Sequence, residues 1–130
     1  MAKYLEPTDF QKSRAYSPAV ITQGGQVVWL AGQTGLRDED GNDLSGNFEA
    51  QVRSVFRSIS ETLKRVGADL QDLVTMTVFI NDARNGDKFV ELRSGYFPSK
   101  NFPASAMITV FGFAQPGILL EIQGVACIDG

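Results

Sequence analysis

The stretch NFEAQVRSVFRSISETLKRVG, residues 47–67, contains the clearest structural signal in the chain. Its apolar side chains recur at steps of three and four, as on one face of an α-helix: Phe48, Val52, Val55, Phe56, Ile59, Leu63 and Val66. Asn47 can serve as the N-cap, and Gly67 can take the left-handed conformation that ends a helix. The pattern therefore predicts a helix that packs one face on a sheet.

Weaker patterns on both sides of this helix complete the fold prediction. A second helix is predicted at residues 85–97, where Phe89, Leu92 and Tyr96 share a face and Pro98 ends the helix. Strand patterns occupy residues 19–22, 27–32, 73–80, 105–111 and 118–128. The order of these elements predicts an α+β fold in which two helices cover one face of a β-sheet.

Alternation along the strands predicts which side chains face the helices. In the third strand the first face has Val74, Met76, Val78 and Ile80, and the second has Thr75, Thr77 and Phe79. In the last strand the first face has Ile118, Leu120, Ile122, Ala126 and Ile128, and the second has Leu119, Glu121, Gln123, Val125 and Cys127. Because apolar groups such as Phe79, Val125 and Leu119 would lie on the uncovered face, we expect a homo-oligomer that packs face to face.

Length and composition place the chain among globular proteins. Its 130 residues fit one domain, residues 1–130, and 43% are hydrophobic and 21% charged. No run of about 18 apolar residues suggests a membrane span. The N-terminus does not resemble a secretory signal and Cys127 is the single cysteine, so a cytoplasmic location is expected.

Charge and the absence of one residue type restrict the possible chemistry. The net charge is -3 and the chain has no block of basic residues, so binding to nucleic acid is not favoured. The sequence contains no histidine, which removes the usual general base, the commonest zinc ligand and any Ser-His or Cys-His pair. Catalysis would have to use carboxylates, tyrosine, serine, cysteine or the backbone.

Glu121 is the main catalytic candidate. It lies in the middle of a strand between Leu120 and Ile122. Partial burial beside a subunit boundary would raise its pKa towards the range useful for proton transfer. The alternative is a solvated glutamate on an open sheet face.

The other candidates each have an ordinary structural reading. Gly32 lies in the stretch AGQTG, residues 31–35, which either lets a ligand approach the backbone or forms a turn. Tyr16 either contacts a ligand or packs in its loop. Ser105 has no neighbouring base that would make it a nucleophile. Cys127 is expected to be a small buried hydrophobic residue.

Taken together, several stretches resemble the Rid family of reactive intermediate deaminases, also called the YjgF or L-PSP endoribonuclease family. The resemblance covers residues 16–126. It depends on YSPAV at 16–20, VWLAGQ at 28–33, TVFIND at 77–82, YFP at 96–98, PAS at 103–105 and LEIQGVA at 120–126. It implies a chorismate-mutase-like fold, a homotrimer with a central barrel, and ligand clefts between subunits.

The resemblance also implies roles for individual residues. Glu121 corresponds to the glutamate that orients the hydrolytic water, and the substrate-binding positions are Tyr16, Ala31, Gly32, Ser105 and Met107. No cofactor or metal is implied. The expected ligand is an imine, an enamine or a metabolite like a 2-keto acid, and the expected partner is the chain itself, without a membrane.

One position departs from the family pattern. Deaminating members carry an arginine where this chain has Ser105, and that arginine grips the substrate carboxylate. Another cation, such as Arg14 or Arg93, would have to replace it. Three hypotheses remain: a deaminase that hydrolyses imines or enamines, a non-enzymatic trimer that binds a metabolite or a protein, and an endoribonuclease. The acidic balance and missing histidine favour the last one least.

Overall fold

The computed structural model of the protein describes residues 2–129. In chain order its helices and strands are β1 (Ala2–Tyr4), α1 (Asp9–Ser13), β2 (Val20–Thr22), β3 (Gln26–Trp29), α2 (Phe48–Lys64), β4 (Leu73–Ile80), α3 (Gly86–Tyr96), β5 (Ala104–Thr109) and β6 (Leu120–Ile128). Short 3-10 turns, Leu70–Asp72 and Ala83–Asn85, precede β4 and α3. The two long helices and the five strands predicted from the sequence are present.

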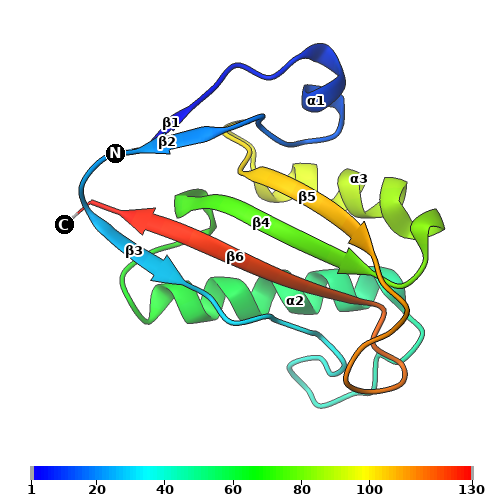
Figure 1. Cartoon of the computed structure of the whole chain (residues 1–130). Coiled ribbons are helices and arrows are strands. Elements are labelled where there is room, and N and C mark those ends of the chain that lie inside the picture. The colour runs from blue at the N-terminus through cyan, green and yellow to red at the C-terminus, as the bar shows by residue number, and fades with distance from the viewer. Residues whose placement is uncertain (1, 130) are drawn as a thin grey trace.

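Four strands form one mixed sheet in the order β3-β6-β4-β5. β4 and β5 run parallel and are joined by α3, whereas β6 is antiparallel to both of its neighbours. Helices α2 and α3 both lie against one face of this sheet (Figure 1). β2 does not enter the sheet but pairs with β1 in a separate two-stranded ribbon. The α+β fold with helices on one face is therefore confirmed.

The long helix α2 forms for the reasons that its sequence suggests. The Asn47 side chain accepts a hydrogen bond from the Ala50 amide at 3.1 Å, and Gly67 has a left-handed φ of 77° just beyond the helix. Phe56 is fully buried and stacks on the ring of Tyr96 in α3, with the centroids 4.1 Å apart. Val66 was predicted to belong to the buried stripe, but the helix ends at Lys64 and Val66 is half exposed.

Two other details differ from the sequence prediction. A register shift between Leu73 and Thr75 interrupts the alternation in β4, so Leu73 is buried and Val74 is only partly buried. Leu119 precedes β6 and packs against the helix-covered core instead of lying on the open face. Val125 does lie on the open face, because its register partners are Trp29 in β3 and Thr75 in β4.

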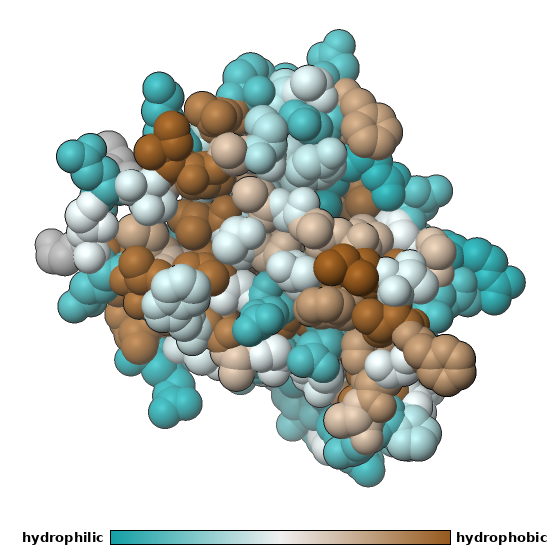
Figure 2. Space-filling view, viewed as in Figure 1, coloured by the Kyte–Doolittle hydropathy of each residue, from teal (hydrophilic) through white to brown (hydrophobic). Residues whose placement is uncertain are grey.

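The open face of the sheet has apolar side chains among polar ones. Trp29 is 78% exposed, and Val27 and Ile108 are about half exposed. Phe79 and Val125 on the inner strands are half-buried. Figure 2 shows this face, where hydrophobic residues lie among hydrophilic ones. Isolated apolar residues are normal on a surface, but a group of this kind on one sheet face is typical of an interface.

Gln51 fixes the start of α2 to two loops. The side chain is fully buried, and its amide nitrogen donates to the carbonyls of Leu44 and Gly117 at 2.9 and 2.8 Å. Its side-chain oxygen accepts a hydrogen bond from the amide of Leu119 at 2.9 Å. One side chain therefore satisfies three backbone groups from two loops that are far apart in the sequence.

Replacing Gly95 in α3 by alanine is expected to raise the free energy of unfolding by about 0.5–1 kcal/mol. A methyl group at this position would meet no atom within 4 Å, and the residue does not have a positive φ. Urea denaturation at one fixed protein concentration measures the change. Gly117→Ala is the control and should destabilise, because Gly117 has a φ of 91° and an added Cβ would lie 2.7 Å from the Ser45 hydroxyl. A loss of stability for Gly95→Ala would contradict the prediction.

Candidate functional site

A pocket lies at the outer edge of the sheet, between β5, α3 and the segment that follows α1. Its volume is about 350 Å³, and it is lined by Arg14, Tyr16, Val90, Arg93, Ser105, Ala106 and Met107. Three residues predicted to bind substrate, Tyr16, Ser105 and Met107, are thus brought together. We call this cavity the edge pocket.

The chain places Tyr16 beside Ser105 through a set of short backbone contacts. The amide of Ser17 donates to the Pro103 carbonyl at 3.1 Å, and its hydroxyl donates to the Phe102 carbonyl at 2.6 Å. Ala15, which is buried, turns the chain with a left-handed φ of 60°. Non-glycine residues rarely adopt this conformation, so the surrounding contacts hold it in place.

Arg93 projects from α3 to the edge pocket from the helix-covered side of β5. One terminal nitrogen donates to the Ser105 hydroxyl and the other to the Arg14 carbonyl, both at 2.8 Å. The side chain is only 2% exposed. Burial, together with the nearby charge of Arg14, lowers the pKa of the Arg93 guanidinium to about 10, so it stays positively charged at neutral pH.

Glu121 lies on the opposite face of the same sheet. Its neighbours in β6, Leu120 and Ile122, are fully buried under the helices, and its register partner in β4 is Phe79. A cavity of about 330 Å³ adjoins it, lined by Phe79, Val110, Gly112, Phe113, Ala114 and Glu121. The carboxylate of Glu121 packs directly against Gly32, where a side chain would collide with it.

The predicted site residues therefore form two groups in one chain. Tyr16, Ser105 and Met107 line the edge pocket, and Gly32 contacts Glu121 on the open face. Ala31 is exposed beside Gly32, and its carbonyl accepts a long hydrogen bond of 3.5 Å from the Gln33 side chain. The structure of the single chain does not bring the two groups together.

Arg93 is a functional candidate that the sequence identifies only as one of two cations, with Arg14, that could replace the missing arginine. A helical wheel contained the signal, because Arg93 follows Phe89 by four residues and precedes Tyr96 by three. It therefore lies on the apolar face of α3. A charged side chain on the apolar face of a helix either extends to solvent or is buried because it has a structural or functional role.

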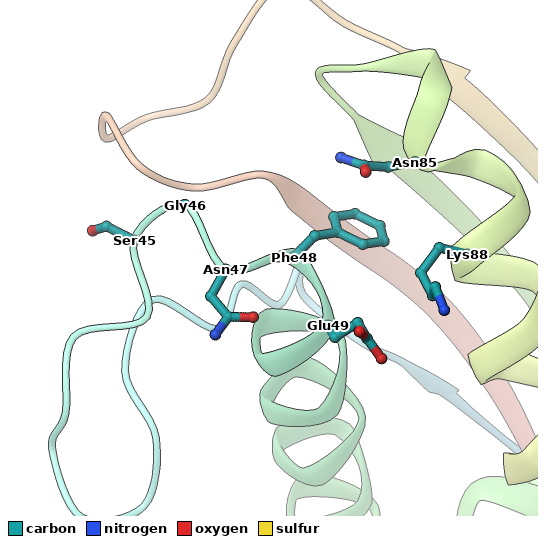
Figure 3. Close-up of a pocket in the computed structure, with 7 residues that line it drawn as sticks. All are labelled: Ser45, Gly46, Asn47, Phe48, Glu49, Asn85 and Lys88. Carbon is teal, nitrogen blue, oxygen red and sulfur yellow. The ribbon is translucent and has the colours of Figure 1, made fainter.

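A larger cavity of about 490 Å³ lies between the first turns of α2 and α3, as Figure 3 shows. It is lined by Ser45, Gly46, Asn47, Phe48, Glu49, Asn85 and Lys88. Asn47 is already engaged in capping α2, and Lys88 pairs with Glu91 at 3.2 Å. None of the predicted site residues lines this cavity, and its side chains do not form a nucleophile and base pair.

Residues 2–129 contain neither a cluster of metal-ligating side chains nor a helix that could span a membrane. No group of three or more cysteine, aspartate or glutamate side chains is arranged to hold a metal ion within this range. No helix described there is long and apolar enough to cross a membrane. The lone Cys127 is half-buried on β6, and its thiol donates a weak hydrogen bond to the Gly24 carbonyl at 3.7 Å.

The fold and the edge pocket define a small α+β protein with a ligand-sized cavity beside its outermost strand. Residues 7–128 match the family described as endoribonuclease L-PSP. The chain belongs to this family, which is also called the Rid, YjgF or RutC family.

Named relatives and solved structures agree with this membership. The chain is 30% identical over 113 residues to the 3-aminoacrylate deaminase RutC of Acinetobacter baylyi, which covers 85% of both chains. It is 28% identical over 111 residues to a mouse 2-iminobutanoate/2-iminopropanoate deaminase, covering 85% of this chain and 79% of the relative. The Rid family protein YyfB of Yersinia pestis superimposes with a TM-score of 0.87 at 22% identity, over 98% of each chain, and this likeness concerns the fold.

Proposed function

We propose that this chain forms a homotrimer and hydrolyses small imines or enamines at a site shared between two copies. The relatives named above are deaminases of an enamine and of imines, which supports the reaction class. The observation that carries the proposal is the separation of Glu121 from Ser105 by the thickness of the sheet. A catalytic glutamate and a substrate pocket on opposite faces can act on one molecule only when they come from different copies.

The open face provides the surface on which a second copy would pack. Trp29, Val27 and Ile108 are exposed there, and a face-to-face assembly would remove them from water. Each copy would then present its Glu121 to one neighbouring copy and its edge pocket to the other neighbour. In a trimer with closed rotational symmetry the three shared sites would be equivalent.

The proposed reaction needs one proton acceptor and one water. Water adds to the carbon of the C=N bond while the Glu121 carboxylate accepts a proton from it, and Glu121 then passes this proton to the nitrogen. The C–N bond of the resulting carbinolamine then breaks, which gives a carbonyl compound and ammonia. An enamine enters the same sequence after it takes up a proton at carbon and loses one from nitrogen, which converts it to the isomeric imine.

A second candidate function is a trimer that binds a metabolite or a protein without turnover. The observation in its favour is that a serine, Ser105, stands where deaminating relatives are expected to have their substrate-binding arginine. The same cavities would then bind a stable ligand. Ammonia release separates the two candidates, because only the deaminase produces it.

Mixing two inactive variants tests the shared site. Glu121→Gln and Tyr16→Ala are expected to be nearly inactive alone, in an assay of ammonia release from freshly generated 2-iminobutanoate or 3-aminoacrylate. Co-expression of the two with different tags should restore about a quarter of the wild-type activity, since about a quarter of randomly paired sites combine two intact halves. Absence of recovery in mixed oligomers would place each site within one chain. A wild type that releases no ammonia from either substrate would favour the binding function.

A further inference from the structure

Arg93 is a buried cation without an acidic partner. Its side chain is 2% exposed, yet none of the ion pairs among the described residues includes it. A terminal nitrogen of Arg93 contacts the sulfur of Met76 at 3.7 Å, and the guanidinium carbon lies 5.2 Å from the centre of the Phe89 ring. Buried charges are normally paired, because their removal from water is unfavourable.

The groups that do contact the guanidinium are neutral. Besides the Met76 sulfur they are the hydroxyl of Ser105 and the carbonyl of Arg14, each 2.8 Å from a terminal nitrogen. The third nitrogen, Nε, is buried and has no hydrogen-bond partner among residues 2–129. The hydrogen bonds orient the side chain, but the protein leaves its positive charge uncompensated.

The contact with Arg93 also determines what Ser105 can do. A guanidinium can only donate, so the Ser105 oxygen accepts this hydrogen bond. The hydroxyl proton must then point away from Arg93. Because Ser105 lines the edge pocket, its proton is available to a ligand there, and the charge behind the oxygen makes the hydroxyl a stronger donor.

The rest of the edge pocket is suited to a small ligand. Val90 and Met107 give it apolar walls, Tyr16 adds a phenol, and the volume is about 350 Å³. Arg14 at the rim is already paired, with its guanidinium 2.6 Å from the Asp87 carboxylate. The unpaired positive charge in this cavity is therefore that of Arg93.

We propose that the edge pocket is an anion site in which the Ser105 hydroxyl donates to a ligand carboxylate and Arg93, behind it, supplies the compensating charge. The cation thus comes from helix α3 instead of strand β5. Arg93 is a positioning residue, and Ser105 is the residue that touches the ligand. This inference rests on the proposed function for the identity of the ligand, a small 2-oxo acid or its imine, while anion binding itself is measured without turnover.

The first test measures binding of 2-oxobutanoate by isothermal titration calorimetry. Its neutral control is 2-oxobutanamide, which has an amide in place of the carboxylate. Wild type should bind the acid and prefer it to the amide, and Arg93→Met should lower the affinity for the acid by about 10- to 100-fold and remove the preference. Arg84→Met should change neither, because Arg84 is exposed and pairs with Asp82 outside the pocket. Wild type that binds neither compound, or both equally, would overturn the inference.

A second variant keeps the test decisive if Arg93→Met does not fold. Ser105→Asp would place a carboxylate of the protein where the ligand carboxylate is expected. Pairing with Arg93 should raise the melting temperature and abolish binding of 2-oxobutanoate, whereas Ser105→Asn, of similar size and neutral, should not raise it. A lower melting temperature for the aspartate than for the asparagine variant would contradict an uncompensated charge at Arg93.

The outcomes separate this inference from the proposed reaction. Carboxylate binding that depends on Arg93, without ammonia release from any imine, would retain the anion site and reject the deaminase. Ammonia release with equal affinity for acid and amide would retain the deaminase and reject the anion site.

Discussion

Replacing Glu121 by glutamine is expected to lower the rate of imine hydrolysis by about 10²- to 10⁴-fold, the range typical of a lost general base. Glutamine has nearly the same shape but cannot accept a proton from water at neutral pH. The side chain lies on the open face against Gly32, and no hydrogen bond within residues 2–129 uses its carboxylate to support the fold. The loss should therefore appear in the rate and not in the free energy of unfolding.

Gly32 provides a second way to disturb the same carboxylate. Gly32→Ala should also reduce the rate, because the added methyl group would displace Glu121. Gly112→Ala is the matched control near the same cavity, where an added Cβ would meet no atom within 4 Å. An unchanged rate in Glu121→Gln, with ammonia release by wild type established, would show that another group activates the water.

Replacing Gln51 by methionine is expected to lower the free energy of unfolding by about 3 kcal/mol or more. Methionine has a similar size, but it cannot form the three hydrogen bonds to Leu44, Gly117 and Leu119. Three backbone groups would lose their partner in a buried environment, at about 1–3 kcal/mol each before the structure relaxes. Chemical denaturation measures the change.

Gln115→Met is the control for this substitution. Gln115 is exposed in the loop before β6, so its replacement should change stability by less than about 0.5 kcal/mol. Equal stability of the two variants would mean that water replaces the Gln51 side chain without loss. The position would then be of little structural importance.

The sequence was sufficient for the elements that are long and periodic. In helix α2 and strand β6 the apolar residues recur over more than two turns or pleats. They follow the period of a helix or a strand because one face of each element is buried. The bulge at Leu73 was not predictable, because it depends on the pairing of β4 with β6 and not on a local pattern. Helix α1 was overlooked, although Thr8 and Gln11 form a capping box, which is a visible local signal.

The candidate site was less accessible from the sequence. Alternation along β6 predicted that Glu121 faces away from the helices, and this follows from a local rule. The position of Ser105 on the helix-covered side of β5 depends on the parallel pairing with β4, in which its partner is the buried Met76. Only the tertiary structure shows that Arg93 and Ser105 meet, since they are on different elements and their contact is set by helix packing.

The last strand in the chain is a central strand of the sheet. β6 lies between β3 and β4, so each of these strands has β6 as a neighbour. During synthesis on the ribosome the nascent chain can form α2 early, but the sheet cannot be completed before residues 120–128 have emerged. Until then β3 has no partner in the sheet and β4 exposes an unpaired edge, a state that favours aggregation. Premature termination before β6 should therefore give an insoluble product and not a shortened domain that retains the pocket.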